Sequence, residues 1–136
     1  MFGQFVDHDL DLEQVGSTAI NIPLPGGGFI PLNSAGPPPA TNTVAGFLDL
    51  SQVYGSDDAT AASLRKKDGT LQSSAGNALP IVNGSFVAGD VRVMENPELT
   101  AVQTLFLREH NFWVGQLHSE HPDWSGDQLY QTPAPL

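Results

Sequence analysis

A long stretch of helical hydrophobic periodicity near the carboxyl end of the chain constrains the fold most. Asn96 precedes this stretch as a candidate N-cap, Pro97 suits the first helical position, and Glu98 complements the helix dipole. The pattern therefore predicts a helix that begins after Asn96 and continues to about His118. The apolar residues that recur at three- and four-residue spacing are Leu99, Val102, Phe106, Trp113 and Leu117.

The remaining elements are short, and the segments between them are rich in the fourteen Gly and eleven Pro of the chain. Strand signals are weak, so the sequence predicts a mainly α fold with long irregular loops and little or no sheet. The expected elements are a helix over 1–13, a long irregular loop over 14–46, a helix over 57–66 capped by Ser56, an extended segment over 70–90, and a last helix from Ser125, whose capping-box partner is Gln128.

Composition excludes several classes of protein. A net charge of −10 with only five Lys and Arg argues against a surface that binds nucleic-acid phosphates. The absence of Cys excludes disulfides and thiolate metal sites, and no apolar run approaches the ~20 residues of a membrane span. No signal-peptide pattern opens the chain, and Met1 begins directly in an amphipathic pattern. We therefore expect both ends to have been cut from something larger.

The expected first helix divides its polar side chains between two faces. His8 shares one face with Gln4, and Asp9 lies on nearly the opposite face. One helix can therefore present an acid–base histidine to one neighbour and a metal-ligating carboxylate to another. The first face carries Gln4, Asp7, His8 and Asp11, and the second carries Phe2, Phe5, Val6 and Asp9.

Two ordinary explanations compete with a functional site in this helix. The alternating aspartates are similar to the start of an EF-hand loop, which needs Gly at position six and Glu at position twelve. Counted from Asp7, those positions hold Leu12 and Thr18, so the EF-hand is excluded. A solvated acidic surface helix stays open as the other explanation.

Two further polar groups are candidates for function. Arg92 and Glu95 lie three residues apart just before the long helix, where they form either part of a site or an ordinary surface ion pair. Phe47, Asp49 and Ser51 alternate a backbone carbonyl, a carboxylate and a hydroxyl, which is a plausible half-site for Ca²⁺. Such a half-site needs more oxygen donors, and Asp9 is the obvious candidate.

Five blocks of sequence, taken together and in order, resemble the animal haem peroxidase family (the peroxidase–cyclooxygenase superfamily), and most closely its bacterial members. Each block alone is moderately specific, but the five in sensible spacing extend over nearly the whole chain. The blocks are Gly3-Gln-Phe-Val-Asp-His-Asp-Leu-Asp-Leu12, Phe47-Leu-Asp-Leu-Ser-Gln-Val-Tyr-Gly-Ser56, Ala88-Gly-Asp-Val-Arg92, Glu95-Asn-Pro-Glu-Leu-Thr100 and Leu107-Arg-Glu-His-Asn111.

The resemblance implies a haem-dependent peroxidase site. His8 matches the distal histidine that moves a proton between the oxygens of hydrogen peroxide, and Arg92 matches the distal arginine. Gln4 matches the distal glutamine that hydrogen-bonds water or a small substrate. Asp7 and Glu95 match the carboxylates that form ester bonds to haem b in many members.

The resemblance also implies a calcium site and marks several departures from the family. Asp9, the Phe47 carbonyl, Asp49 and Ser51 match the calcium ligands, whereas Ala45 stands where the family has a Thr ligand. Asn96 stands where one mammalian branch has a haem-linked Met, so no sulfonium bond is expected.

The proximal histidine of the family lies downstream of every matching block. We expect His110, His118 and His121 to be structural or exposed rather than to ligate iron. The resemblance therefore implies that residues 1–136 are a partial peroxidase domain, which carries the distal half, lacks the proximal half and is weak or inactive alone.

The expected function is oxidation of a small donor or halide with consumption of hydrogen peroxide. Two alternatives are a non-catalytic, truncated or pseudoenzyme product that binds calcium, and a lipid dioxygenase relative within the superfamily. The resemblance implies a secreted or extracellular location, no nucleic-acid partner, no membrane span, and the missing proximal half as a partner.

Overall fold

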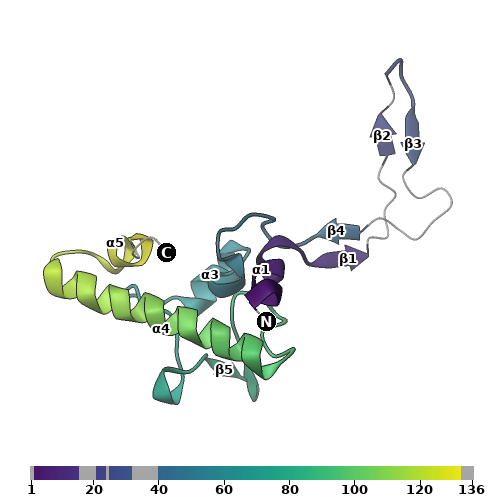
Figure 1. Cartoon of the computed structure of the whole chain (residues 1–136). Helices are drawn as coiled ribbons and strands as arrows, with labels where there is room; N and C mark the ends of the chain where they lie inside the picture. Colours follow the sequence, from purple (N-terminus) through teal and green to yellow (C-terminus); the bar gives the residue numbers. More distant parts are fainter. Residues whose placement is uncertain (1, 16–20, 24, 32–39, 133–136) are drawn as a thin grey trace.

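A computed structural model describes residues 2–15, 21–23, 25–31 and 40–132. Helices dominate these residues, and the strands form only two-stranded antiparallel pairs, so the expected mainly α class is confirmed (Figure 1). The helices are α1 (Phe2–Leu10), α2 (Ser51–Tyr54), α3 (Asp58–Leu64), α4 (Pro97–Glu120) and α5 (Gly126–Gln131), with a 3-10 turn η1 (Ala75–Asn77). The strands are β1 (Glu13–Val15), β2 (Asn21–Pro23), β3 (Phe29–Pro31), β4 (Ala40–Asn42), β5 (Ile81–Val82) and β6 (Ser85–Phe86).

The capping residues of the last two helices are those that the sequence predicts. The Asn96 side chain accepts a hydrogen bond from the Leu99 N–H at 2.7 Å, which satisfies a free donor in the first turn of α4. Ser125 and Gln128 form the reciprocal capping box at the start of α5. Local side-chain chemistry therefore fixes where these helices begin.

The buried face of α4 differs from the predicted apolar stripe. Trp113, part of the predicted apolar stripe, is 36 % exposed, while Gln103 and His110 are buried. Gln103 donates from Nε2 to the Gln52 carbonyl at 3.1 Å, so the polar side chain satisfies a buried backbone acceptor. The buried residues of α4 are Leu99, Gln103, Leu107, His110 and Val114.

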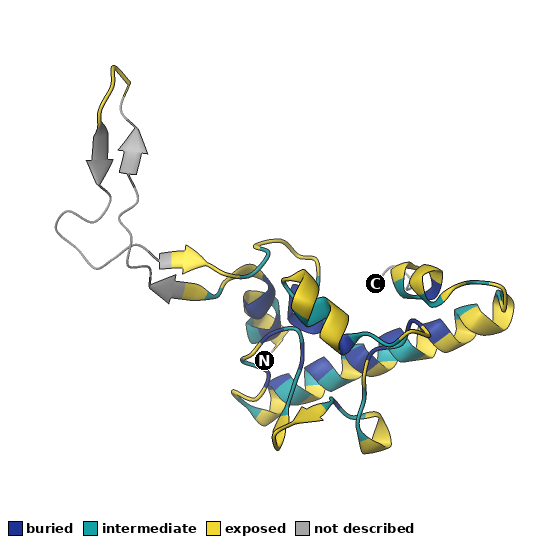
Figure 2. Cartoon of the chain, turned by 180° about the vertical axis from the view of Figure 1, so that it is seen from behind, coloured by how far each residue is buried: buried dark blue, intermediate teal, exposed yellow. Residues whose placement is uncertain are grey.

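The core lies where α1 and α2 pack against one side of α4 and α3 packs against α2, and Figure 2 shows buried residues gathered along that side of α4. Phe5 of α1 stacks on Phe106 of α4 with ring centroids 4.7 Å apart. This contact fixes α1 against α4 and so determines which neighbours the polar residues of α1 meet. The buried apolar cluster also includes Val53, Leu64, Leu71, Leu79, Val93, Leu99 and Leu107.

Two boundaries near the amino end correct the sequence prediction. The first helix ends at Leu10 instead of residue 13, because Asn42 accepts a hydrogen bond from the Leu12 N–H and donates one to the Leu10 carbonyl. The expected irregular loop over 14–46 contains β1 paired with β4 and β2 paired with β3. The β2–β3 hairpin projects away from the helices (Figure 1). Residues 16–20, 24 and 32–39 of that loop lie outside the described part.

The cap of α3 also differs from the prediction. Asp57, not Ser56, accepts hydrogen bonds from the N–H groups of Ala59 and Thr60, both at 2.9 Å.

None of the helices in the described residues combines the length and apolar character needed to cross a bilayer.

Gly89 is required by a close approach of two backbone segments. A Cβ at this position would lie 2.3 Å from the Ser51 carbonyl oxygen and 2.4 Å from the Gly55 nitrogen. These atoms are backbone and cannot rotate away. The segment that precedes α4 is therefore held directly against α2.

We expect Gly89→Ala to lower the free energy of unfolding by about 2–3 kcal/mol, as overpacking does in a filled core. Gly115→Ala is the matched control, because its Cβ would meet no atom within 4 Å in the middle of α4. The control should raise stability by about 0.5–1 kcal/mol through helix propensity. Urea denaturation measures both, and wild-type stability in Gly89→Ala would contradict the close approach.

Candidate active site

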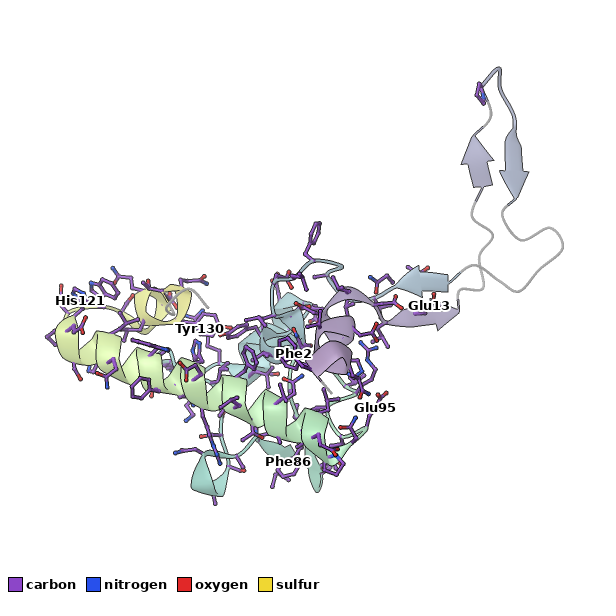
Figure 3. All side chains as sticks on the ribbon, in the orientation of Figure 1. Phe2, Glu13, Phe86, Glu95, His121 and Tyr130 are labelled. Atoms are coloured by element: carbon purple, nitrogen blue, oxygen red, sulfur yellow. The ribbon has the colours of Figure 1, made fainter. Side chains whose placement is uncertain are left out.

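Side chains from α1 and from the segment before α4 converge on one carboxylate. Gln4 Nε2 lies 2.9 Å from Glu95 Oε2, and His8 Nε2 lies 3.4 Å from the same oxygen. Figure 3 shows Glu95 at the start of α4 beside α1. The packing of α1 on α4 therefore brings together residues that are about ninety positions apart in the chain.

Arg92 belongs to this group through its guanidinium. Its Nη2 donates to the His8 carbonyl oxygen at 3.3 Å, across 84 positions of sequence. The side chain is only 16 % exposed. Arg92 is thus not an ordinary surface ion pair, and its carboxylate partner is Asp90 rather than the predicted Glu95.

The Asp90–Arg92 pair is bidentate. Nε donates to Asp90 Oδ1 at 3.0 Å and Nη2 donates to Oδ2 at 2.7 Å. These hydrogen bonds raise the pKa of the Arg92 guanidinium above its usual value, and partial burial opposes the rise. Arg92 therefore stays a cation throughout the working pH range of proteins.

His8 is buried between two carboxylates. Its Nε2 lies near Glu95, and its Nδ1 lies 3.9 Å from Asp90 Oδ1. Within the described residues Nδ1 has no hydrogen-bond partner. The ring is thus held by packing, while Nε2 faces the group made by Gln4 and Glu95.

Gln4 is oriented by Asn96. Asn96 donates from Nδ2 to Gln4 Oε1 at 2.7 Å while its own Oδ1 caps α4. The Gln4 amide is therefore turned so that its NH₂ group points at Glu95. The sequence predicts the cap, but this second role of Asn96 depends on the approach of α1.

The candidate calcium ligands gather at the other side of α1. Asp9 Oδ1 accepts the Ser51 hydroxyl at 2.8 Å, and Asp9 Oδ2 accepts the Leu50 N–H at 2.9 Å. Asp49 Oδ1 accepts the Ser51 N–H at 3.1 Å. Neighbouring residues His8 and Asp9 thus face different segments, as the helical periodicity predicts.

This loop has an unusual backbone at Leu50, which adopts a left-handed conformation with φ of 61°. Such a conformation costs a non-glycine residue free energy, so surrounding contacts must hold it. The Asp9 carboxylate provides one such contact through the Leu50 N–H. In the described part of the chain, no three His, Cys, Asp or Glu side chains are grouped so that they could hold a metal ion. Phe47 is exposed, and its carbonyl as a ligand stays a prediction.

Asp7 lies on the exposed side of α1. Its charge makes a minor contribution to the raised pKa of Arg92. No hydrogen bond in the described residues joins the Asp7 side chain to the other candidate residues. Its proposed role toward haem therefore stays a prediction.

The other three histidines have the structural or exposed positions that the sequence analysis expects. His110 is buried, and its two ring nitrogens contact the Tyr54 hydroxyl at 3.2 Å and the Gly69 carbonyl at 3.0 Å. Because a carbonyl only accepts, Nε2 carries the proton and Nδ1 accepts from Tyr54. His118 is exposed, and His121 stacks on Trp124.

Comparison with known proteins identifies the class. The family model described as animal haem peroxidase matches residues 30–133, and the chain belongs to this family. It is 37 % identical to eosinophil peroxidase of Mus musculus and 36 % identical to myeloperoxidase of Homo sapiens over 65 % and 66 % of its own length. The chain spans only 16 % and 15 % of those two proteins.

Solved structures support the same fold. A variant of the fatty acid α-dioxygenase of Oryza sativa with palmitic acid superposes with a TM-score of 0.70 at 28 % identity, over 93 % of this chain and 24 % of that one. Peroxidase A from Dictyostelium discoideum gives 0.72 at 20 % identity, over 96 % and 35 %. The fold of this chain is therefore shared by peroxidases and dioxygenases.

The buried imidazole of His110 makes stability depend on pH. Burial lowers the pKa of His110 below its usual 6.5, so the unfolded chain binds this proton more readily than the folded chain. The His110 contribution to stability is therefore complete above pH 6.5 and is lost as the pH falls below that value.

We expect the wild-type melting temperature to fall more steeply between about pH 7 and pH 5 than that of His110→Gln, which cannot take up the proton. His118→Gln, at an exposed position of the same helix, is the control and should keep the wild-type slope. Parallel slopes for wild type and His110→Gln would exclude His110 as the acid-sensitive group.

Proposed function

We propose that this chain supplies the peroxide-facing side of a haem-dependent peroxidase, and that residues 1–136 are part of one peroxidase domain. The observation that carries the proposal is that Gln4 and His8 share Glu95 while the Arg92 guanidinium reaches the backbone carbonyl of His8, 84 positions away in the sequence. Reduction of hydrogen peroxide requires a base close to the proton it removes and a cation close to the developing charge. Both kinds of group are present here.

In this proposal His8 Nε2 takes a proton from one peroxide oxygen and returns it to the other, so that water leaves. Arg92 stabilises the negative charge that develops as the O–O bond breaks. Gln4 orients water or a small substrate through its amide. Haem, when bound beside these residues, would supply the two electrons for this reduction, and a small organic donor or a halide would return them.

Glu95 has a different role before and after haem binds. Its side chain accepts a hydrogen bond from Gln4. Because the side chain is 46 % exposed, it has room to turn away from Gln4 into solvent. We propose that Asp7 and Glu95 would hold haem b, since they match the carboxylates that are ester-linked to haem in many members of the family. Withdrawal of the Glu95 carboxylate then leaves His8 Nε2 and the Gln4 amide available to peroxide.

The described residues fit one side of haem only. An imidazole, a guanidinium and an amide suit the peroxide side. Because His8 is assigned as the base on that side, it cannot also be the iron ligand on the opposite side. Both ring nitrogens of His110 are hydrogen-bonded, so it offers none either. We therefore expect the chain alone to bind haem weakly and to need the proximal half of a peroxidase for full activity.

A calcium ion joining α1 to the loop before α2 is supported by the burial of Asp9. The side chain is 1 % exposed, and its hydrogen-bond donors, Leu50 N–H and Ser51 hydroxyl, are neutral. Buried carboxylates in proteins are normally paired with a cation. No Lys, Arg or His lies within ion-pair distance of Asp9 in the described part of the chain. We propose Asp9, the Phe47 carbonyl, Asp49 and Ser51 as ligands.

A second candidate function is oxygenation of a fatty acid. The similarity to the α-dioxygenase of Oryza sativa with palmitic acid favours it, at 28 % identity over nearly the whole chain. Two measurements distinguish the functions: a peroxidase consumes hydrogen peroxide, and a dioxygenase takes up oxygen with palmitic acid.

By family membership we propose a secreted or extracellular peroxidase.

The first test concerns haem. We expect hemin added to the full chain to give no sharp, stoichiometric Soret band of a histidine-ligated haem, because both ring nitrogens of His110 are hydrogen-bonded and His121 lies at the opposite end of α4 from Glu95 (Figure 3). The visible spectrum of wild type and His8→Ala provides the measurement. A sharp band that persists in His8→Ala would contradict a missing proximal ligand.

External imidazole can then stand in for that ligand. With hemin and imidazole present, the wild-type chain should increase the rate of peroxide consumption above the hemin–imidazole background. The increase with His8→Ala should be smaller than the wild-type increase by about 10²-fold or more. His118→Gln is the matched control. An increase that is equal in wild type and His8→Ala would overturn the assignment of His8.

The calcium proposal has its own test. Calcium should raise the melting temperature of wild type, because an ion that binds only the folded chain stabilises it, and Asp49→Ala should lose this increase. Asp58→Ala, another exposed acid, is the control. Ala45→Thr should tighten binding by restoring a hydroxyl ligand. Equal calcium affinity of wild type and Asp49→Ala by calorimetry would refute the site.

A further inference from the structure

We infer that Asp90 is a positioning residue that orients both Arg92 and His8 in the candidate active site. The inference rests on the proposed function for its chemical meaning, but its geometry stands by itself. Asp90 is buried, lies two positions before Arg92, and is close to Nδ1 of His8, a buried ring nitrogen without a hydrogen-bond partner in the described residues.

Asp90 fixes the plane of the Arg92 guanidinium. The two carboxylate oxygens accept from Nε and Nη2, and the second proton of Nη2 is directed to the His8 carbonyl. In the described residues these bonds use Nε and Nη2 only. Nη1 therefore keeps both of its protons for another acceptor, such as a peroxide oxygen. A long side chain with several rotatable bonds becomes a donor with one direction.

Asp90 also favours one tautomer of His8. A base at Nε2 requires the proton of the neutral imidazole to be on Nδ1. Asp90 Oδ1 lies 3.9 Å from Nδ1, beyond a hydrogen bond but close enough for a carboxylate to attract the N–H dipole in a buried site. The Asp90 carboxylate thus fixes the Arg92 guanidinium and also favours the His8 tautomer whose lone pair is on Nε2.

The backbone of Asp90 is itself held in place. Its N–H donates to the Gln52 carbonyl at 3.0 Å, and its carbonyl accepts from the Val93 N–H at 3.3 Å. Asp90 Oδ1 also accepts the Arg92 N–H at 2.7 Å, which closes a short turn between the two residues. Gly89 beside it lies directly against the backbone of Ser51 and Gly55, where there is no room for a Cβ. The carboxylate is therefore a fixed reference for Arg92.

The other nearby carboxylate does not have these properties. Glu95 is half exposed and accepts from Gln4, and no ion pair joins it to Arg92 in the described part of the chain. Removal of its charge would leave the Asp90–Arg92 fork intact. Asp90 is thus the one that determines where the guanidinium points.

The test uses nitrogen NMR of the full chain without haem. The sequence has three arginines, so three Nε–H signals are expected, and Arg92→Lys assigns the signal of Arg92. We expect Arg92 Nε–H to exchange with solvent at least about tenfold more slowly than that of Arg65, whose partner Asp127 is exposed. Asp90→Asn should lower this protection, because the neutral amide oxygen accepts more weakly from Nε than a carboxylate does and the amide NH₂ cannot accept from Nη2.

The matched control is Asp127→Asn, which removes the carboxylate partner of Arg65 and should leave the Arg92 signal unchanged. Ring-nitrogen shifts of the neutral His8 imidazole, recorded in Glu95→Ala so that no carboxylate faces Nε2, should show the Nδ1–H tautomer. Addition of Asp90→Asn to that variant should remove the predominance of this tautomer. A purely structural role for Asp90 would alter stability without moving either signal.

Two results would overturn the inference. One is a wild-type Arg92 Nε–H that exchanges as fast as that of Arg65, which needs no variant and holds even if Asp90→Asn fails to fold. The other is a folded Asp90→Asn chain with unchanged exchange and tautomer. Failure to consume peroxide with hemin and imidazole counts against the proposed function alone, since neither NMR signal depends on haem.

Discussion

Three buried hydrogen bonds at Gln52 connect the parts on which the rest of the structure depends. Its side chain donates to the Phe5 carbonyl of α1, and its own carbonyl accepts from Asp90 and from Gln103 of α4. A buried backbone group without a partner would cost about 1–3 kcal/mol, so these polar contacts restrict how the segments pack. The four-residue helix α2 therefore acts as the common support of α1, of the segment before α4, and of α4 itself.

The candidate active site lies where those supported segments meet. His8 and Asp9 are adjacent on α1, yet one faces Arg92 and Glu95 while the other faces Leu50 and Ser51. The stacking of Phe5 on Phe106 sets this rotation of α1. In a chain with few cations, the buried Asp90 carboxylate holds the Arg92 guanidinium in a fixed position near the histidine. The position of that charge is a property of the backbone around Gln52 as much as of Arg92.

The sequence alone determined the features that depend on neighbouring residues. Asn96 and Pro97 start the long helix, and Ser125 with Gln128 starts the last one, because capping is a hydrogen bond within three positions. The period of α1 placed His8 and Asp9 on different faces. Five blocks of sequence indicated the family, and the family match agrees. These local and motif-level signals fix the class and name the candidate residues.

Tertiary structure decided everything that needed two distant segments. Asn42 ends α1 early by bonding across about thirty positions, and Gln103 is buried because a carbonyl of α2 needs a donor. No local pattern marks either residue. Asp90 stood in a recognised block beside Arg92, but its role required the burial and the approach of His8 that packing provides. Residue type and spacing state what a side chain can do, and only the packed structure decides which partner it meets.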